Sequence, residues 1–161
     1  MTVEDYNNCV EDYADGLYRF ILKNIRDEEK ASDIVQDSFE KLWRKVKDVD
    51  PNKAKSYLFS TAYHTMIDGI RKEKRIEDFS HVRSEHHAHD EQYSDLQEIL
   101  HEALAKLTEI QKTVILLRDY EGYSYGEIGE ITGLNESQVK VYIYRARVFL
   151  KNYIGSLQAV I

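Results

Sequence analysis

Residues 123–151, YSYGEIGEITGLNESQVKVYIYRARVFLK, have the pattern of two short helices joined by a tight turn. Ser124 is followed three residues later by Glu127, which is the spacing of a capping box at a helix start. Asn135 and Gln138 repeat this spacing at the start of the second helix. The stretch therefore predicts a helix-turn-helix.

The glycines and apolar residues of this stretch support the same motif. Gly133 is typical of a helix end, and Gly129 is small enough to let a second helix cross close by. Apolar residues recur at helical spacing in both helices and are expected in the core: Ile128, Ile131, Val139, Ile143, Ala146 and Leu150. Another face of the second helix carries Ser137, Lys140, Val141 and Tyr144, flanked by Arg145 and Arg147. In a helix-turn-helix such a face lies in the major groove of DNA.

The charge of this segment differs from that of the whole chain. The chain has 29 acidic and 22 basic residues and a net charge of −7, whereas residues 137–161 carry four cations and no carboxylate. A basic segment in an acidic protein indicates a nucleic-acid contact, although a helical hairpin with a solvated basic face is the alternative. Because phosphate neutralisation supplies much of the affinity for DNA, we expect weak binding to free DNA and a larger partner that supplies most of the grip.

Length and composition predict a globular, all-α protein. The chain has 161 residues, 42% of them hydrophobic, and one proline, and its apolar spacings are helical almost throughout. The single cysteine, Cys9, lies on an apolar stripe, so we expect a core thiol, no intramolecular disulfide and a reducing compartment. Because the sequence has no signal peptide and no apolar run near the roughly 20 residues of a membrane span, we expect a cytoplasmic protein without membrane insertion.

Two small helical domains joined by a polar linker are predicted. Helices are expected over residues 2–25, 27–46, 51–75, 96–107, 108–122 and the two of the helix-turn-helix. Asp50 and Pro51 form an N-cap and N1 pair, and Thr108 with Gln111 another capping box. Helical spacing fails from about residue 76 to residue 95, and so long a connection favours separate domains. The domain boundaries are set at 1–78 and 96–161, with a linker over 79–95.

Three ordered stretches resemble one protein family. DIVQDSFEKLW (33–43) and SYLFSTAYHTMIDGIRKEKR (56–75) are similar to consecutive helices of bacterial RNA polymerase sigma factors. LTEIQKTVILLRDYEGYSYGEIGEITGLNESQVKVYIYRARVFL (107–150) resembles their C-terminal domain. The absence of a domain between them resembles the extracytoplasmic-function (ECF) class of the sigma-70 family. The resemblance implies a promoter-specific initiation subunit that is not an enzyme and needs no cofactor or metal.

The resemblance also implies residue roles. The residues matching the helix that docks on core polymerase are Asp33, Gln36, Asp37 and Trp43. For Trp43 a mainly structural role in the core is favoured over docking. The residues matching the −10 promoter contacts are Tyr57, Tyr63, His64, Arg71, Lys72, Lys74 and Arg75. The aromatic members are equally compatible with core positions, whereas the cations are expected on phosphates. The −35 contacts would be Ser137, Lys140, Val141, Tyr144, Arg145 and Arg147.

The partners implied are core RNA polymerase, promoter DNA and an anti-sigma factor. A two-domain helix-turn-helix regulator that does not bind polymerase stoichiometrically is the main alternative. A metalloenzyme is a remote one, because the sequence has no HExxH, GxSxG or Gly-rich phosphate loop. Four linker histidines, His81, His86, His87 and His89, have no cysteine partner or structured context, so no metal site is predicted.

Overall fold

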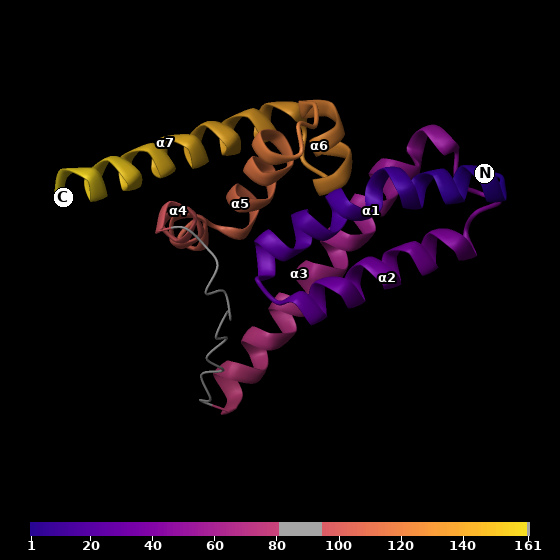
Figure 1. Ribbon diagram of the computed structural model, residues 1–161, viewed down its shortest axis with the longest axis horizontal. Helices are drawn as coiled ribbons and strands as arrows, with labels where there is room; N and C mark the ends of the chain where they lie inside the picture. The colour runs from indigo at the N-terminus through magenta and orange to yellow at the C-terminus, as the bar shows by residue number, and fades with distance from the viewer. Residues whose placement is uncertain (81–94, 161) are drawn as a thin grey trace. The chain divides into compact units, whose positions relative to one another are not determined.

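A computed structural model describes the backbone of residues 1–80 and 95–160 and the side chains of residues 1–78 and 95–156. All secondary structure in these ranges is helical, in agreement with the predicted all-α class (Figure 1). The chain divides into two compact units, Met1–Ala88 and His89–Ile161. The four linker histidines, His81, His86, His87 and His89, lie outside the described residues.

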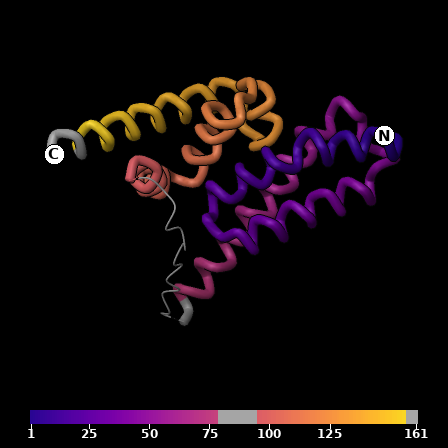
Figure 2. Tube along the Cα trace, viewed as in Figure 1, coloured from indigo at the N-terminus to yellow at the C-terminus, as the bar shows by residue number. Residues whose placement is uncertain are grey.

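The first unit is a bundle of three long helices. Its elements are α1 (Val3–Ile25), α2 (Glu28–Arg44), the 3₁₀ turn η1 (Pro51–Lys53) and α3 (Ala54–Ser80). Each of the three α-helices packs against the other two (Figures 1 and 2). Their shared core contains the fully buried side chains of Leu17, Phe20, Ile21, Leu42, Leu58, Phe59 and Met66.

Local capping explains where these helices begin. Asp27 starts α2 by accepting a hydrogen bond from the Lys30 amide at 3.1 Å, as the sequence predicts. Asp50 accepts from the Asn52 amide at 2.9 Å. Contrary to expectation, Pro51 begins a 3₁₀ turn and the α-helix starts only at Ala54.

Two helix ends differ from the prediction. Helix α2 ends at Arg44, two residues before the expected end, and α3 continues to Ser80 instead of ending near residue 75. Residues 74–78 are solvent-exposed, so burial does not mark this end of the helix. The added residues 76–80 have the sequence IEDFS, and α3 continues through them past its packed part.

The second unit is built around one long helix. Its elements are α4 (Asp95–Ala105), α5 (Glu109–Ile115), the single π-helical turn η2 (Leu116–Tyr120), α6 (Tyr125–Thr132) and α7 (Glu136–Val160). Helix α7 packs against α4, α5 and α6. The side chains buried between them include Leu104, Val114, Leu116, Leu117, Ile128, Ile131, Val139 and Ile143.

The apolar periodicity places most core residues correctly, with exceptions at helix ends. Val3 and Val10 lie at helical spacing on the apolar stripe of α1, but they are 60% and 37% exposed. Leu150 is only half-buried, because the neighbouring helices cover mainly the N-terminal part of α7. Phe59 is fully buried although the sequence analysis assigned it no role.

Candidate nucleic-acid interface

The predicted helix-turn-helix is formed by α6, a tight turn and α7. Glu127 and Ser124 exchange hydrogen bonds of 3.1 Å at the start of α6. Asn135 and Gln138 do the same at 3.0 and 2.8 Å at the start of α7. Both predicted capping boxes are therefore confirmed.

Two glycines shape the turn between these helices. Gly133 adopts a left-handed conformation with φ of 82°, and its amide donates to the Gly129 carbonyl at 2.8 Å. A β-carbon on Gly129 would lie 2.8 Å from the carbonyl oxygen of Leu134. The close approach expected at Gly129 therefore involves the backbone of the turn and not a crossing helix.

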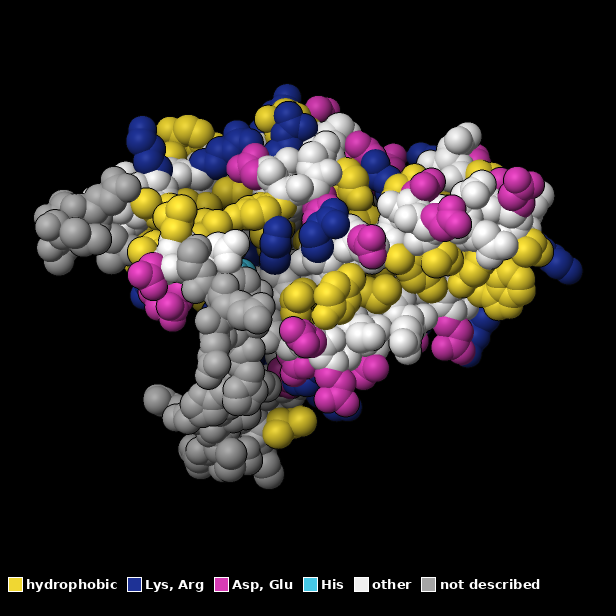
Figure 3. Space-filling view, viewed as in Figure 1, with side chains coloured by type: hydrophobic (Ala, Val, Ile, Leu, Met, Phe, Trp, Pro, Cys, Tyr) yellow, Lys and Arg dark blue, Asp and Glu magenta, His cyan; other side chains and the backbone are white. Residues whose placement is uncertain are grey.

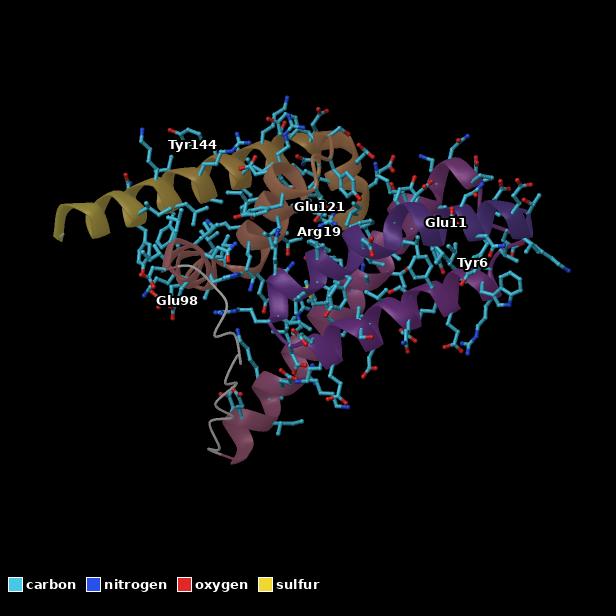
Figure 4. All side chains as sticks on the ribbon, in the orientation of Figure 1. Tyr6, Glu11, Arg19, Glu98, Glu121 and Tyr144 are labelled. Atoms are coloured by element: carbon cyan, nitrogen blue, oxygen red, sulfur yellow. The ribbon has the colours of Figure 1, made fainter. Side chains whose placement is uncertain are left out.

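Helix α7 has one buried face and one exposed face. Val139 and Ala146 are fully buried and Ile143 is 1% exposed. The opposite face is exposed along its length and includes the predicted −35 residues: Ser137, Lys140, Val141, Tyr144, Arg145 and Arg147. Tyr144 is 69% exposed and points away from the unit (Figure 4). Lys and Arg side chains gather over this helix (Figure 3), so its free surface is both basic and apolar.

Arg147 is held by an acidic partner within the same unit. Its Nε and Nη2 donate to Oδ2 and Oδ1 of Asp119, at 3.1 and 2.5 Å. The hydrogen bond to Asp119 is the main reason that the pKa of Arg147 is raised. By contrast, none of the carboxylates in the described ranges pairs with the exposed side chain of Arg145. The two arginines predicted to contact phosphates are thus in different electrostatic states.

A cluster around Tyr125 was missed by the sequence analysis. The guanidinium of Arg118 lies 4.4 Å from the centroid of the Tyr125 ring, and Nζ of Lys140 lies 5.4 Å from it. Arg118 also donates to the carbonyl of Tyr123 at 2.9 Å. These residues come from η2, α6 and α7, so only the tertiary fold brings them together. Their spacing in the sequence therefore does not predict the cluster.

In the first unit the predicted −10 cations project from the C-terminal part of α3. The exposed members are Arg71, Lys72, Lys74 and Arg75. Glu73, between them in sequence, pairs instead with Lys30 of α2. Within residues 1–78 no carboxylate pairs with any of the four cations. Among the described residues, this cluster therefore creates a local positive potential toward the end of α3.

The three aromatic residues predicted near the −10 element lie along α3. Tyr57 and Tyr63 are half-buried and His64 is exposed. Lys45 Nζ lies 6.0 Å from the Tyr57 ring centroid. His64 Nδ1 lies 2.7 Å from the carbonyl oxygen of Ser60. Because a carbonyl only accepts, Nδ1 must carry the proton, and neutral His64 therefore has its acceptor at Nε2.

The predicted polymerase-docking residues lie on α2. Asp33 and Gln36 are exposed, and Asp37 forms an ion pair with Lys41 at 2.9 Å. Trp43 is 47% exposed, so the favoured interpretation of Trp43 as a core residue is wrong. Its ring meets that of Tyr6 edge-on, with 5.0 Å between the ring centroids.

The described part of the chain has neither a metal-binding cluster nor a membrane-spanning helix. Among these residues no three His, Cys, Asp or Glu side chains are grouped as a metal ion would require. None of the described helices combines the length and apolarity that crossing a bilayer demands.

Comparisons with known proteins match both units. The family profile described as "Sigma-70 region 2" matches residues 9–76, and "Sigma-70, region 4" matches residues 97–150. Together they cover the α1–α3 bundle and the helix-turn-helix. The segment between the two profiles contains the predicted linker.

Relatives extend the similarity over most of the chain. RNA polymerase sigma factor SigV of Bacillus subtilis is 36% identical over 86% of this chain and 84% of its own length. ECF RNA polymerase sigma factor SigE of Mycolicibacterium smegmatis is 28% identical over 93% of this chain, which spans only 62% of that relative. The sigma factor RpoE of Bartonella quintana, solved in complex with the anti-sigma factor NepR, superimposes with a TM-score of 0.82 at 28% identity, covering 95% of this chain and 98% of that one.

Proposed function

The chain belongs to the sigma-70 family of RNA polymerase sigma factors, in its ECF class, and we propose that its two units divide the work of promoter-specific initiation. Residues 1–78 dock on core polymerase and engage the −10 element, residues 96–161 engage the −35 element, and residues 79–95 connect them. The matches to sigma-70 regions 2 and 4 support this division.

The observation that carries the −35 assignment is the free face of α7. Lys140 and Arg145 are exposed there, while Val139 and Ile143 anchor the opposite face in the core. Such an arrangement lets a helix enter the major groove without disturbing its own fold. Lys140 is suited to a guanine edge and the exposed side chain of Val141 to a thymine methyl, while Arg145 is suited to phosphate.

For the −10 element we propose two kinds of contact. The four exposed cations of α3, Arg71, Lys72, Lys74 and Arg75, bind phosphates, which sets the position of the unit without reading sequence. Tyr57, Tyr63 and His64 receive an unstacked base, since extrusion of a base is compensated by stacking and hydrogen bonds. The acceptor at Nε2 of neutral His64 favours a base with an exocyclic amino group.

The docking surface on core polymerase consists of Asp33, Gln36, Asp37 and Trp43. An exposed Trp is a common anchor at the centre of a protein interface. This attachment also accounts for the net charge of −7: the polymerase supplies the main hold on DNA, and the sigma factor adds local basic contacts.

We further propose that an anti-sigma factor controls this protein. The support is the structural similarity to the Bartonella quintana sigma factor bound to its anti-sigma factor. The protein acts in the cytoplasm, where its polymerase and promoters are located, and it has no catalytic role of its own.

The decisive test is transcription in vitro with core polymerase and this protein. The template is a library randomised separately at the −10 and −35 elements. We expect transcripts only from templates that carry a defined subset of −10 and −35 sequences. We also expect this protein to co-purify with core polymerase in stoichiometric amounts. Lys140→Ala should change the −35 preference only, whereas His64→Ala should change the −10 preference only. Failure to bind core polymerase would favour a helix-turn-helix regulator instead.

A further inference from the structure

The Tyr125 ring contacts both an anchored cation, Arg118, and a cation on α7, Lys140. Arg118 is fixed at two points, by its hydrogen bond of 2.9 Å to the Tyr123 carbonyl and by its contact of 4.4 Å with the ring. The ring in turn contacts Lys140 at 5.4 Å. A chain of contacts therefore runs from η2 through α6 to the exposed face of α7.

Lys140 has little else to hold it in place. Its ammonium lies 4.0 Å from the carboxylate of Glu136, at the limit of an ion pair, and both side chains are more than half exposed. Exposed pairs of this kind contribute little, and a lysine side chain has high rotamer entropy. Besides this weak ion pair, the aromatic ring of Tyr125 is the other described group that contacts the ammonium of Lys140.

We infer that Tyr125 is a positioning residue for DNA recognition, which orients the Lys140 ammonium toward the −35 base edges. The inference rests on the proposed function of α7 in reading the −35 element. A long cation that is restrained before binding loses less entropy when it contacts a base, and it reaches fewer alternative bases. Tyr125 therefore acts on sequence preference through Lys140 and need not contact DNA itself.

The alternative is that Tyr125 only covers the core of the unit. A structural role would weaken folding, and its loss would lower transcription from every promoter alike. A positioning role predicts instead a selective loss of base preference at the position that Lys140 reads. The base preference at the −35 element therefore distinguishes the two roles, because it does not depend on the total amount of transcript.

The test uses the reconstituted holoenzyme and a promoter library randomised only at the −35 element. We expect Tyr125→Leu to reduce the base preference attributed to Lys140 by roughly 2- to 5-fold, the effect of one exposed cation–π contact. Tyr125→Phe keeps the ring and should retain the preference. In a Lys140→Ala background, Tyr125→Leu should cause no further loss, because the two residues act through one contact.

Two further variants separate positioning from folding. Tyr153→Leu is the matched control, because it removes a ring that contacts Lys106 at 5.6 Å in the same unit; it should leave the −35 preference unchanged. Replacing Tyr125 by pentafluorophenylalanine keeps the shape of the ring and reverses its attraction for cations, so it should reproduce the Leu effect even if Tyr125→Leu does not fold.

The outcomes that overturn the inference are distinct from those that overturn the proposed function. If the wild-type holoenzyme selects no −35 sequence, both are wrong. If it does, and the pentafluorophenylalanine variant keeps the wild-type preference, the positioning role alone is wrong. Additive effects of Tyr125→Leu and Lys140→Ala would also overturn it.

Discussion

Arg147 and Asp119 form a two-point ion pair that joins α7 to the π-helical turn η2. Nε donates to Oδ2 at 3.1 Å and Nη2 to Oδ1 at 2.5 Å, across 28 positions in the sequence. The side chains are 49% and 36% exposed, so solvent screens the attraction. The pair fixes the guanidinium of Arg147 within the second unit, whereas Arg145, two residues earlier, remains available.

Arg145→Ala should weaken promoter binding by the holoenzyme about equally on all promoters. A lost phosphate contact releases fewer counterions, so the slope of log affinity against log salt should become shallower by about 1. The measurement is promoter binding by the holoenzyme at several salt concentrations. Unchanged salt dependence would exclude Arg145 as a phosphate contact.

Arg147→Ala should behave differently, because Asp119 already neutralises this guanidinium. We expect a loss of about 0.2–1 kcal/mol in the free energy of unfolding, the range for exposed ion pairs, with little change in the salt slope. Asp119→Asn should have a similar effect on stability. If Arg147→Ala instead lowers the salt slope as much as Arg145→Ala does, then phosphate displaces Asp119 in the complex.

Gly129→Ala should destabilise the helix-turn-helix by about 1–3 kcal/mol, because its methyl group would meet the rigid Leu134 carbonyl at 2.8 Å. Gly126→Ala is the control within the same helix. Nothing lies within 4 Å of its added β-carbon, so it should stabilise α6 by up to about 1 kcal/mol.

Urea unfolding of the full chain tests this pair of variants. Trp43 is the single tryptophan and belongs to the first unit, so its fluorescence follows that unit, whereas circular dichroism follows all helices. The Gly129 variant should shift the dichroism transition and leave the fluorescence transition in place. Equal stability of the two variants would contradict the close approach.

The helix-turn-helix could be predicted from sequence because its determinants are local. Each capping box needs only residues three positions apart, and both were found as expected, with Ser124 and Glu127 at one start and Asn135 and Gln138 at the other. The helical period likewise identified the buried and exposed faces of α7. The residues that define a cap or a helix face all lie within one or two helical turns of one another.

Features that depend on contacts between distant segments were not predictable. The exposure of Trp43 depends on which face of α2 the other helices cover, and a Trp at helical spacing has the same pattern whether or not another helix covers it. The Tyr125 cluster requires η2, α6 and α7 to meet. The extension of α3 to Ser80 follows the point where the helical spacing of apolar residues fails, so a hydrophobic pattern does not register it.

Cys9 should react slowly with alkylating reagents in the folded protein. The side chain is 7% exposed, and burial, followed by the charges of Asp12 and Asp5, raises the pKa of the thiol above its ordinary value of 9.0. The measurement is the rate of reaction with iodoacetamide against pH, in the folded chain and in urea. A folded thiol that reacts at the unfolded rate would contradict its burial.

The same shift links the stability of the protein to pH. Because the thiol of the unfolded chain loses its proton first, the contribution of Cys9 to stability is fully present below the unfolded pKa, near 9.0, and is lost as the pH rises from there through the raised pKa of the folded protein. The difference in the free energy of unfolding between wild type and Cys9→Ala should therefore decrease above pH 9. If this difference in the free energy of unfolding increases with pH, the pKa of Cys9 is not raised in the folded protein.

Trp43→Ala should impair binding to core polymerase far more than it impairs folding. Trp43 is half exposed and its described ring contact is the edge of Tyr6, so truncation should cost less stability than the about 3–5 kcal/mol typical of a Trp buried in a core. An aromatic side chain at the centre of an interface is typically worth at least about 2 kcal/mol, or roughly 30-fold in affinity.

Leu42→Ala is the opposite control: this neighbour is fully buried, and its truncation should cost about 2–5 kcal/mol of stability. Competition for core polymerase against labelled wild-type protein, with urea unfolding of each variant, measures both quantities. If the Trp43→Ala variant competes for core polymerase as well as the wild-type protein does, Trp43 is not part of the docking surface.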